Sequence, residues 1–207
     1  MIVRTLHFDR MIRRAIGDVG QVVVMGAGYD MRAYGGLRRE GVTFFELDQA
    51  KVQRHKREAL AAAGIPSDHV RFVEIDFEID APFEKLRDAG FDPSRKTLFL
   101  WEGVTLYLSE ADVRRMIRAL REKAAPGSLL LADFYAKRFV DIAAKKAIRK
   151  TLDYTDEGLG FGLPFATDHE RVLRAFVQSE GMALGEVQFM GAASDKGPFM
   201  VVAEMRI

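Results

Sequence analysis

Acidic residues follow four short apolar runs along the chain. Asp48, Asp76, Glu102 and Asp133 each come directly after a run of aliphatic, β-branched or aromatic residues. A carboxylate accepts hydrogen bonds and can therefore bind hydroxyl or amino groups of a ligand. Acidic residues also favour turns, so any one of the four has an ordinary structural explanation. Four in succession predict an edge of a sheet that is lined with carboxylates.

A glycine turn precedes the first of these acids. Gly26-Ala27-Gly28 follows the apolar run 21–25, and Asp48 lies 20 residues after Gly28. Glycine allows a sharp turn and a close approach of a ligand to the main chain, and an acid at this spacing can accept hydrogen bonds from ribose hydroxyls. Met31 stands where the dinucleotide fingerprint has its third small residue. The turn and the acid together predict an adenosine-type cofactor.

Asp30 indicates whether the adenosine-type cofactor carries phosphate groups. We expect a helix after the glycine turn, with Asp30 in its first turn. A carboxylate there would occupy the helix amides and repel a pyrophosphate group. The sequence also lacks the Gly-x-x-x-x-Gly-Lys-Ser/Thr loop that binds triphosphates. S-adenosyl-L-methionine, which has no phosphate and carries a positive sulfonium, fits these residues.

The elements that position these residues alternate between strand and helix. Apolar runs predict strands at 21–25, 42–47, 70–75, 97–101 and 128–132. Amphipathic spacing predicts helices over 49–63, 110–124 and 167–178. The segments 183–190 and 198–206 predict two final strands that form a hairpin. We therefore predict an α/β fold: a doubly wound, mostly parallel seven-stranded sheet with a C-terminal antiparallel hairpin, which binds ligands beyond the carboxyl ends of its strands.

Two sequence patterns predict where helices begin. Ser109 with Asp112, and Thr167 with Glu170, have the spacing of a capping box. Pro126-Gly127 is expected to end the helix over 110–124.

Composition excludes several classes of protein. The 207 residues include 48% hydrophobic and 29% charged residues, ordinary values for a single globular domain over 1–207. Without cysteine, the chain has no disulfide, thiolate zinc site or cysteine nucleophile. The four histidines lack metal-ligand spacing, so we expect no metal site. No apolar run approaches the roughly 20 residues of a membrane span, and the charged first residues are unlike a secretory signal, so we expect a cytoplasmic protein.

The balance of basic and acidic residues indicates whether the chain binds nucleic acid. With 31 basic and 30 acidic residues the chain has no basic excess, so we expect no nucleic-acid partner. The basic stretch 137–150 is interpreted as a solvated helix face.

Three motifs resemble those of a known family. They are Val-Val-Val-Met-Gly-Ala-Gly-Tyr-Asp-Met-Arg at 22–32, Phe-Phe-Glu-Leu-Asp at 44–48 and Glu-Gly-Val-Thr-Leu-Tyr-Leu-Ser at 102–109. In this order they resemble the leucine carboxyl methyltransferase-like family of S-adenosylmethionine-dependent O-methyltransferases, which includes bacterial polyketide O-methyltransferases. The resemblance implies a Rossmann-like class I methyltransferase.

The resemblance also implies site residues. The expected cofactor-binding residues are Arg4, Gly26, Ala27, Gly28, Asp48, Asp76, Phe77 and Glu102, and Tyr107 is expected to face the substrate as the catalytic residue. Arg4 would hold the methionine carboxylate and Asp48 the ribose hydroxyls. Asp76 and Phe77 would contact adenine, and Glu102 would lie beside the methionine.

Departures from the family bear on the substrate. Family members usually begin well before the position of Arg4, so we expect part of the usual substrate lid to be missing or supplied by a partner subunit, as in a homodimer. One member of the family methylates a phosphatase. Glu78 replaces an arginine of that enzyme, so we do not expect a phosphatase as the substrate of this chain. Residues 134–166, which include Tyr154 and Gly158, are expected to cap the substrate.

The resulting prediction is methylation of a small-molecule carboxylate or hydroxyl oxygen. A nicotinamide-dependent dehydrogenase and a non-catalytic cofactor-binding module are the alternatives. A nucleic-acid methyltransferase is disfavoured, because Trp101-Glu102-Gly103 differs from the Asn/Asp-Pro-Pro-aromatic motif of such enzymes.

Overall fold

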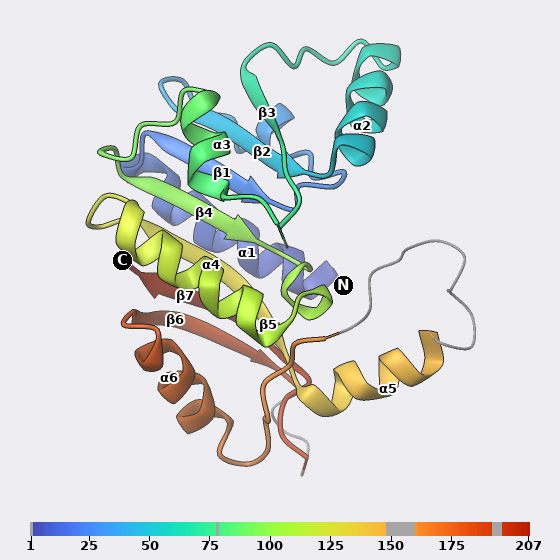
Figure 1. Ribbon diagram of the computed structural model, residues 1–207, viewed down its shortest axis with the longest axis vertical. Helices are drawn as coiled ribbons and strands as arrows, with labels where there is room; N and C mark the ends of the chain where they lie inside the picture. Colours follow the sequence, from blue (N-terminus) through green and yellow to red (C-terminus); the bar gives the residue numbers. More distant parts are fainter. Residues whose placement is uncertain (1, 78, 148–159, 192–195) are drawn as a thin grey trace. The chain divides into compact units, whose positions relative to one another are not determined.

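The computed structural model describes residues 2–77, 79–147, 160–191 and 196–207. The chain divides into two compact units. The first contains Met1–Trp101, Lys123–Leu131 and Ile207, and the second contains Glu102–Glu122 and Ala132–Arg206. Seven strands form one sheet in the order β3-β2-β1-β4-β5-β7-β6 (Figure 1).

The strands confirm the predicted fold class. They are β1 (Gln21–Met25), β2 (Thr43–Asp48), β3 (Val70–Glu74), β4 (Thr97–Trp101), β5 (Leu129–Tyr135), β6 (Ala183–Met190) and β7 (Met200–Arg206). β1 pairs in parallel with β2 and β4, and β2 pairs in parallel with β3. β6 and β7 pair antiparallel, as the hairpin prediction required. Every residue of β1 and β4 is buried, which explains their uninterrupted apolar sequences.

Six α-helices lie in the described residues. They are α1 (Ile2–Ala15), α2 (Ala50–Ala62), α3 (Pro82–Asp88), α4 (Glu110–Lys123), α5 (Lys137–Ala147) and α6 (His169–Ser179). The helices α1 and α3 were not predicted from the sequence. In the first unit, α1 and α3 lie on opposite faces of the strands (Figure 1).

The helix predicted after the glycine turn is absent from residues 26–42, all of which the structure describes. This stretch holds only a 3₁₀ turn, Arg32–Tyr34. Gly35, Gly36 and Gly41 disfavour a longer helix, and β2 begins at Thr43. Asp30 therefore does not occupy the first turn of an α-helix. Its carboxylate accepts the backbone N–H of Arg32 at 2.7 Å instead.

Two further predictions are wrong. Asp133 does not end its strand, because β5 continues to Tyr135, and its side chain is buried. Thr167 does not begin the last helix: the N-cap of α6 is Asp168, which makes no capping hydrogen bond with its side chain. The other capping box is confirmed, since Ser109 Oγ accepts the N–H of Asp112 at 3.1 Å.

Aromatic side chains fill the core of the first unit. Phe91 packs edge-on against Phe45 of β2 and Phe83 of α3, with ring centroids 5.7 and 5.8 Å apart. Phe99 of β4 completes the cluster. Trp101 is fully buried, as expected for a core residue. This packing fixes the strands whose carboxyl ends carry the predicted site.

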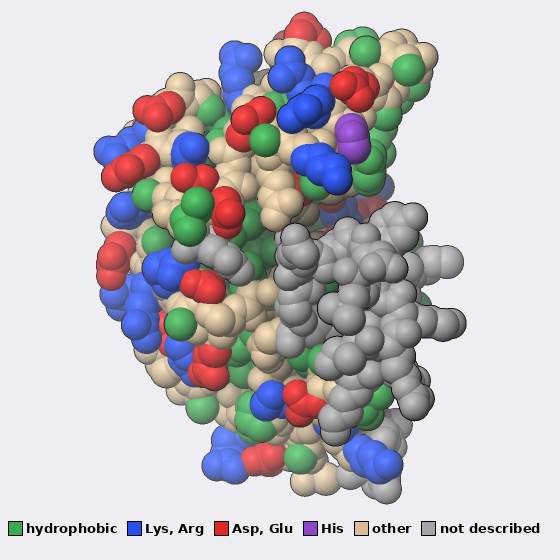
Figure 2. Space-filling view, turned by 45° about the vertical axis from the view of Figure 1, so that its right-hand side comes forward, with side chains coloured by type: hydrophobic (Ala, Val, Ile, Leu, Met, Phe, Trp, Pro, Cys, Tyr) green, Lys and Arg blue, Asp and Glu red, His purple; other side chains and the backbone are tan. Residues whose placement is uncertain are grey.

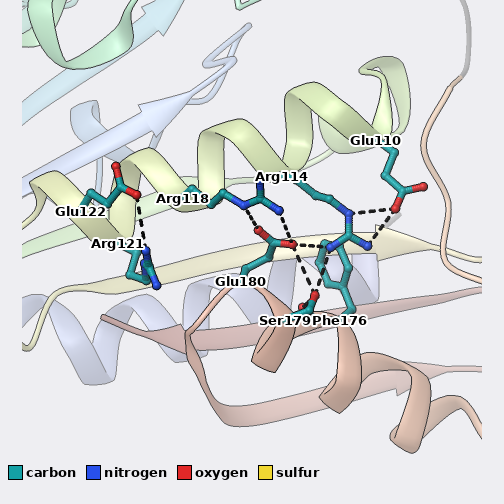
Figure 3. Close-up of polar contacts among 8 residues, drawn as sticks. All are labelled: Glu110, Arg114, Arg118, Arg121, Glu122, Phe176, Ser179 and Glu180. Carbon is teal, nitrogen blue, oxygen red and sulfur yellow. Dashed lines mark hydrogen bonds and ion pairs between the residues drawn. The ribbon is translucent and has the colours of Figure 1, made fainter.

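An ion-pair cluster joins α4 and α6 in the second unit (Figure 3). The Glu180 carboxylate, just after α6, is buried and pairs with Arg114 and Arg118 of α4. The Arg114 guanidinium also lies 4.8 Å from the ring centroid of Phe176. The two helices are therefore linked by ion pairs and by a cation–π contact.

The described surface carries both signs of charge. Figure 2 shows basic and acidic side chains interspersed over the face in view. In the part of the chain that the structure describes, no helix is long and apolar enough to cross a bilayer.

Candidate functional site

The glycine turn lies where the strand order reverses. β2 and β3 extend to one side of β1, and β4 pairs with its other side. Sheets of this kind bind ligands in the crevice beyond the carboxyl ends of the strands at such a reversal. Gly26 and Gly28 follow β1 there, with φ of 69° and 45° that favour glycine.

Backbone hydrogen bonds bring three predicted segments together at this edge. The N–H groups of Gly26 and Ala27 donate to the Leu47 carbonyl at 2.8 and 3.0 Å. The N–H of Ile75 donates to the Asp48 carbonyl at 3.0 Å. The structure therefore brings the glycine turn, Asp48 and the segment that contains Asp76 to one edge of the first unit, as predicted.

The Asp48 carboxylate shapes the turn directly. Its Oδ2 accepts the N–H of Gly28 at 2.6 Å, and its Oδ1 accepts the N–H of Gln49 at 2.7 Å. A carboxylate offers about four acceptor positions, so two bonds leave capacity for ligand hydroxyls. A Cβ atom built at Gly28 would meet no atom within 4 Å outside its chain neighbours, so the turn has open space beside it.

Asp76 and Phe77 follow β3. Asp76 is exposed and Phe77 is half-buried. The N–H of Asp76 donates to Asp80 Oδ2 at 2.9 Å, which folds this segment into a turn. Glu78 lies outside the described residues. Asp76 therefore lies exposed on the segment after β3, and its contact with adenine stays a prediction.

Arg4 lies on α1 and is half-buried. The same helix is linked to the loop after the glycine turn, because Asp9 pairs with Arg32 Nε at 2.7 Å. Arg32 also pairs with Asp30 at 2.5 Å. α1 is therefore part of the support of the loop, a connection that the sequence analysis did not foresee.

Glu102 and Tyr107 belong to the second unit. Glu102 directly follows β4 and is half-buried, and Tyr107 ends a 3₁₀ turn with 40% of the residue exposed. The turn is held by Asp133, whose carboxylate accepts the N–H of Gly103 at 2.9 Å and whose carbonyl accepts the Thr105 hydroxyl at 2.7 Å. Asp133 thus supports this segment from inside and does not line an open edge.

The described part of the predicted capping segment contributes to a cavity in the second unit. This cavity, of about 550 Å³, is lined by residues of α4 and α6 and by Lys137 and 161–164. Tyr107 is not among its lining residues. Tyr154 and Gly158 lie outside the described residues.

Sequence reasoning missed a buried polar cluster beneath the glycine turn. Lys56 of α2 and Glu46 of β2 are buried and pair at 2.7 Å. Burial raises the pKa of Glu46, while Lys56 acts in the opposite direction. Burial likewise raises the pKa of the neighbouring Tyr34. A signal was present, because Lys56 shares the apolar stripe of Val52 and Leu60 at a spacing of four.

No group of three or more metal-ligating side chains occurs among the described residues.

The family model of leucine carboxyl methyltransferase matches residues 1–120. The chain belongs to this family. A curated relative from Mycolicibacterium gilvum, named "Putative S-adenosyl-L-methionine-dependent methyltransferase", is 40% identical over 135 residues, which are 64% of this chain and 44% of the relative. A similarly named protein from Mycolicibacterium smegmatis is 34% identical over 171 residues, which are 82% of this chain and 56% of the relative. The chain spans about half the length of these relatives.

A solved structure shows the same fold. The S-adenosylmethionine-dependent methyltransferase from Mesorhizobium loti matches with a TM-score of 0.63 and 12% identity, over 96% of each chain. The class I methyltransferase fold predicted from the sequence is confirmed, and the family match confirms the resemblance drawn from the three motifs.

Proposed function

We propose that this chain binds S-adenosyl-L-methionine and transfers its methyl group to a carboxylate or hydroxyl oxygen of a small molecule. The observation that carries the proposal is the junction of the glycine turn with Asp48 at the reversal of strand order. The family of the chain and the names of its relatives give the cofactor class.

The residues at this edge fit the cofactor. Asp48 retains acceptor capacity for two ribose hydroxyls, Asp76 is exposed for the adenine amine, and the space beside Gly28 is open. Arg4, Ala27, Phe77 and Glu102 stay predicted contacts. When bound, the cofactor supplies an electrophilic methyl group on a positive sulfur. The task of the protein is then to hold donor and acceptor in line.

The family description favours an oxygen acceptor. A leucine carboxyl methyltransferase acts on a carboxylate by its name. A carboxylate needs no general base, whereas a hydroxyl benefits from one. Tyr107, exposed on the turn after β4, would orient either group.

Five further statements stay predictions: the single domain over 1–207, the cap at 134–166, the homodimer, the cytoplasmic location and the absence of a nucleic-acid partner.

The same geometry disfavours a nicotinamide cofactor. A dinucleotide places its pyrophosphate on the N-terminus of the helix after the glycine turn. Residues 26–42 contain only the 3₁₀ turn Arg32–Tyr34 in that place. The helix that the sequence predicted around Asp30 is absent, so repulsion by Asp30 at a helix N-terminus does not apply. Without that helix, a dinucleotide has no helix N-terminus here for its pyrophosphate.

Calorimetric titration with S-adenosylmethionine and with S-adenosylhomocysteine tests the proposal. Wild type should bind both with micromolar affinity. Asp48→Ala should weaken binding about a hundredfold, because it removes the ribose acceptor and the partner of the Gly28 N–H. Asp48→Asn keeps one acceptor oxygen, so its affinity for both ligands should fall only about tenfold.

Asp88→Ala is the matched control, since Asp88 is exposed at the end of α3 and remote in sequence from the glycine turn. It should bind like wild type. Reduced nicotinamide dinucleotide should give no heat. Undiminished binding by Asp48→Ala, or binding of the dinucleotide instead, would overturn the assignment.

A further inference from the structure

The buried side chain of Lys56 contacts the loop that follows the glycine turn. Its Nζ donates to the backbone carbonyl of Asp30 at 2.6 Å and pairs with Glu46 Oε2 at 2.7 Å. It also lies 5.3 Å from the ring centroid of Tyr34. One side chain of α2 therefore contacts the loop, β2 and the 3₁₀ turn at once.

Burial makes these contacts strong. The side chains of Lys56 and Glu46 are only 2% and 1% exposed. Water has little access to the Lys56 ammonium, so its bond to the Asp30 carbonyl fixes the loop more firmly than a bond from an exposed lysine would. The neighbouring Gln53 fixes α2 itself, because its amide donates to the carbonyls of Glu46 and Val73 at 2.7 and 2.8 Å.

The cluster acts on a short piece of backbone next to the candidate cofactor site. The N–H of Asp30 donates to the Ala27 carbonyl at 2.7 Å, so the residue held by Lys56 is bonded back to the glycine turn. Gly28 in turn is held by Asp48. In addition to the backbone bonds of Gly26 and Ala27 to Leu47, two side chains from outside the loop hold this backbone: Asp48 at Gly28 and Lys56 at Asp30.

We propose that Lys56, paired with Glu46, is a positioning residue that holds the glycine turn in the conformation that binds the cofactor. This proposal rests on the proposed function. Lys56 lies too deep to touch a ligand and acts through the carbonyl of Asp30.

The test compares variants in the ligand-free protein and in the titration. Lys56→Met removes the donor at nearly constant length and should increase amide hydrogen exchange of residues 27–31 in the ligand-free protein at least tenfold. It should weaken binding of S-adenosylhomocysteine by tenfold to a hundredfold, the range for a lost hydrogen bond to a charged group. The double variant Glu46→Gln, Lys56→Met avoids an unpaired buried carboxylate and should show the same two effects if the single variant does not fold.

Leu60→Ala is the control for general destabilisation. Leu60 is buried on the same helix, one turn after Lys56, and makes no hydrogen bond to the loop with its side chain. It should lower the unfolding temperature but leave exchange of 27–31 and the affinity within twofold of wild type. The proposal fails if the Lys56 variants leave loop exchange unchanged, or if Leu60→Ala alters loop exchange and affinity as much as they do.

The outcomes separate the two proposals. Wild type that does not bind the homocysteine product would contradict the proposed function, while the exchange measurement would still test the role of Lys56. Wild type that binds, with Lys56 variants that bind equally well, would contradict only the positioning role.

Discussion

Glu180 shows how a buried carboxylate is stabilised by its partners. Burial opposes its ionisation, but hydrogen bonds from Arg118 and Arg114 outweigh burial and hold the pKa of Glu180 below its usual value. The ionised form is therefore favoured in the folded protein. The stability that it contributes is complete above the unfolded pKa of about 4.3 and is lost as the pH falls through the lower folded value.

Glu180→Gln should lower the free energy of unfolding at pH 7 by about 2 kcal/mol, because the variant keeps the shape but loses the charge-assisted bonds. The difference from wild type should shrink below about pH 4, where wild-type Glu180 is itself protonated. Urea unfolding at several pH values measures both effects.

Glu122→Gln is the matched control on α4, the helix that carries Arg114 and Arg118. Its side chain is 58% exposed and lies 3.4 Å from Arg121, an arrangement that contributes little in water. The free energy of unfolding should change by less than about 0.5 kcal/mol. A Glu180→Gln variant as stable as this control would show that the cluster in Figure 3 does not hold α4 to α6.

At the scale of elements, two helix starts with the same sequence pattern differ in whether the predicted cap forms. Ser109 and Thr167 both precede a helix with an acid three residues later. Only Ser109 forms the cap, while the N-cap of α6 is Asp168, one residue after Thr167, and the Asp168 side chain pairs with Arg171. Local spacing thus predicts a helix start but not which residue makes the bond.

Ser109→Ala should cost about 1 kcal/mol of stability, since the N–H of Asp112 loses its acceptor. Thr167→Ala should cost clearly less. Thermal unfolding of the two variants side by side measures the difference, and equal losses would show that the Ser109 bond is not a stabilising cap.

The strands were predicted more closely than the loops. β1 and β4 have the predicted bounds because both are buried on both faces and bounded by turns. The loop from Gly26 to Val42 was mispredicted because no apolar periodicity constrains it, and side chains from α1, β2 and α2 determine its shape. Contacts between residues twenty or more apart leave no local pattern.

At the scale of the whole molecule, binding of the proposed cofactor should be measurable as a gain in stability. A ligand that binds only the folded state stabilises it by an amount set by its concentration. S-adenosylhomocysteine at 100 times its dissociation constant should raise the free energy of unfolding by about 2.7 kcal/mol.

Scanning calorimetry at several ligand concentrations checks this shift, which should grow with the logarithm of concentration. Asp48→Ala should show a much smaller shift at the same concentrations. A shift of equal size in that variant would place the ligand away from the glycine turn.

Met31, which departs from the dinucleotide fingerprint, also gives the protein a built-in chemical reporter. It is 45% exposed beside the glycine turn, whereas Met11, Met25 and Met116 are buried. Peroxide converts accessible methionine to the sulfoxide, a mass increase that is easily located in a peptide digest. Footprinting at this one sulfur can therefore follow occupancy of the neighbouring crevice without a label and before any methyl acceptor is identified.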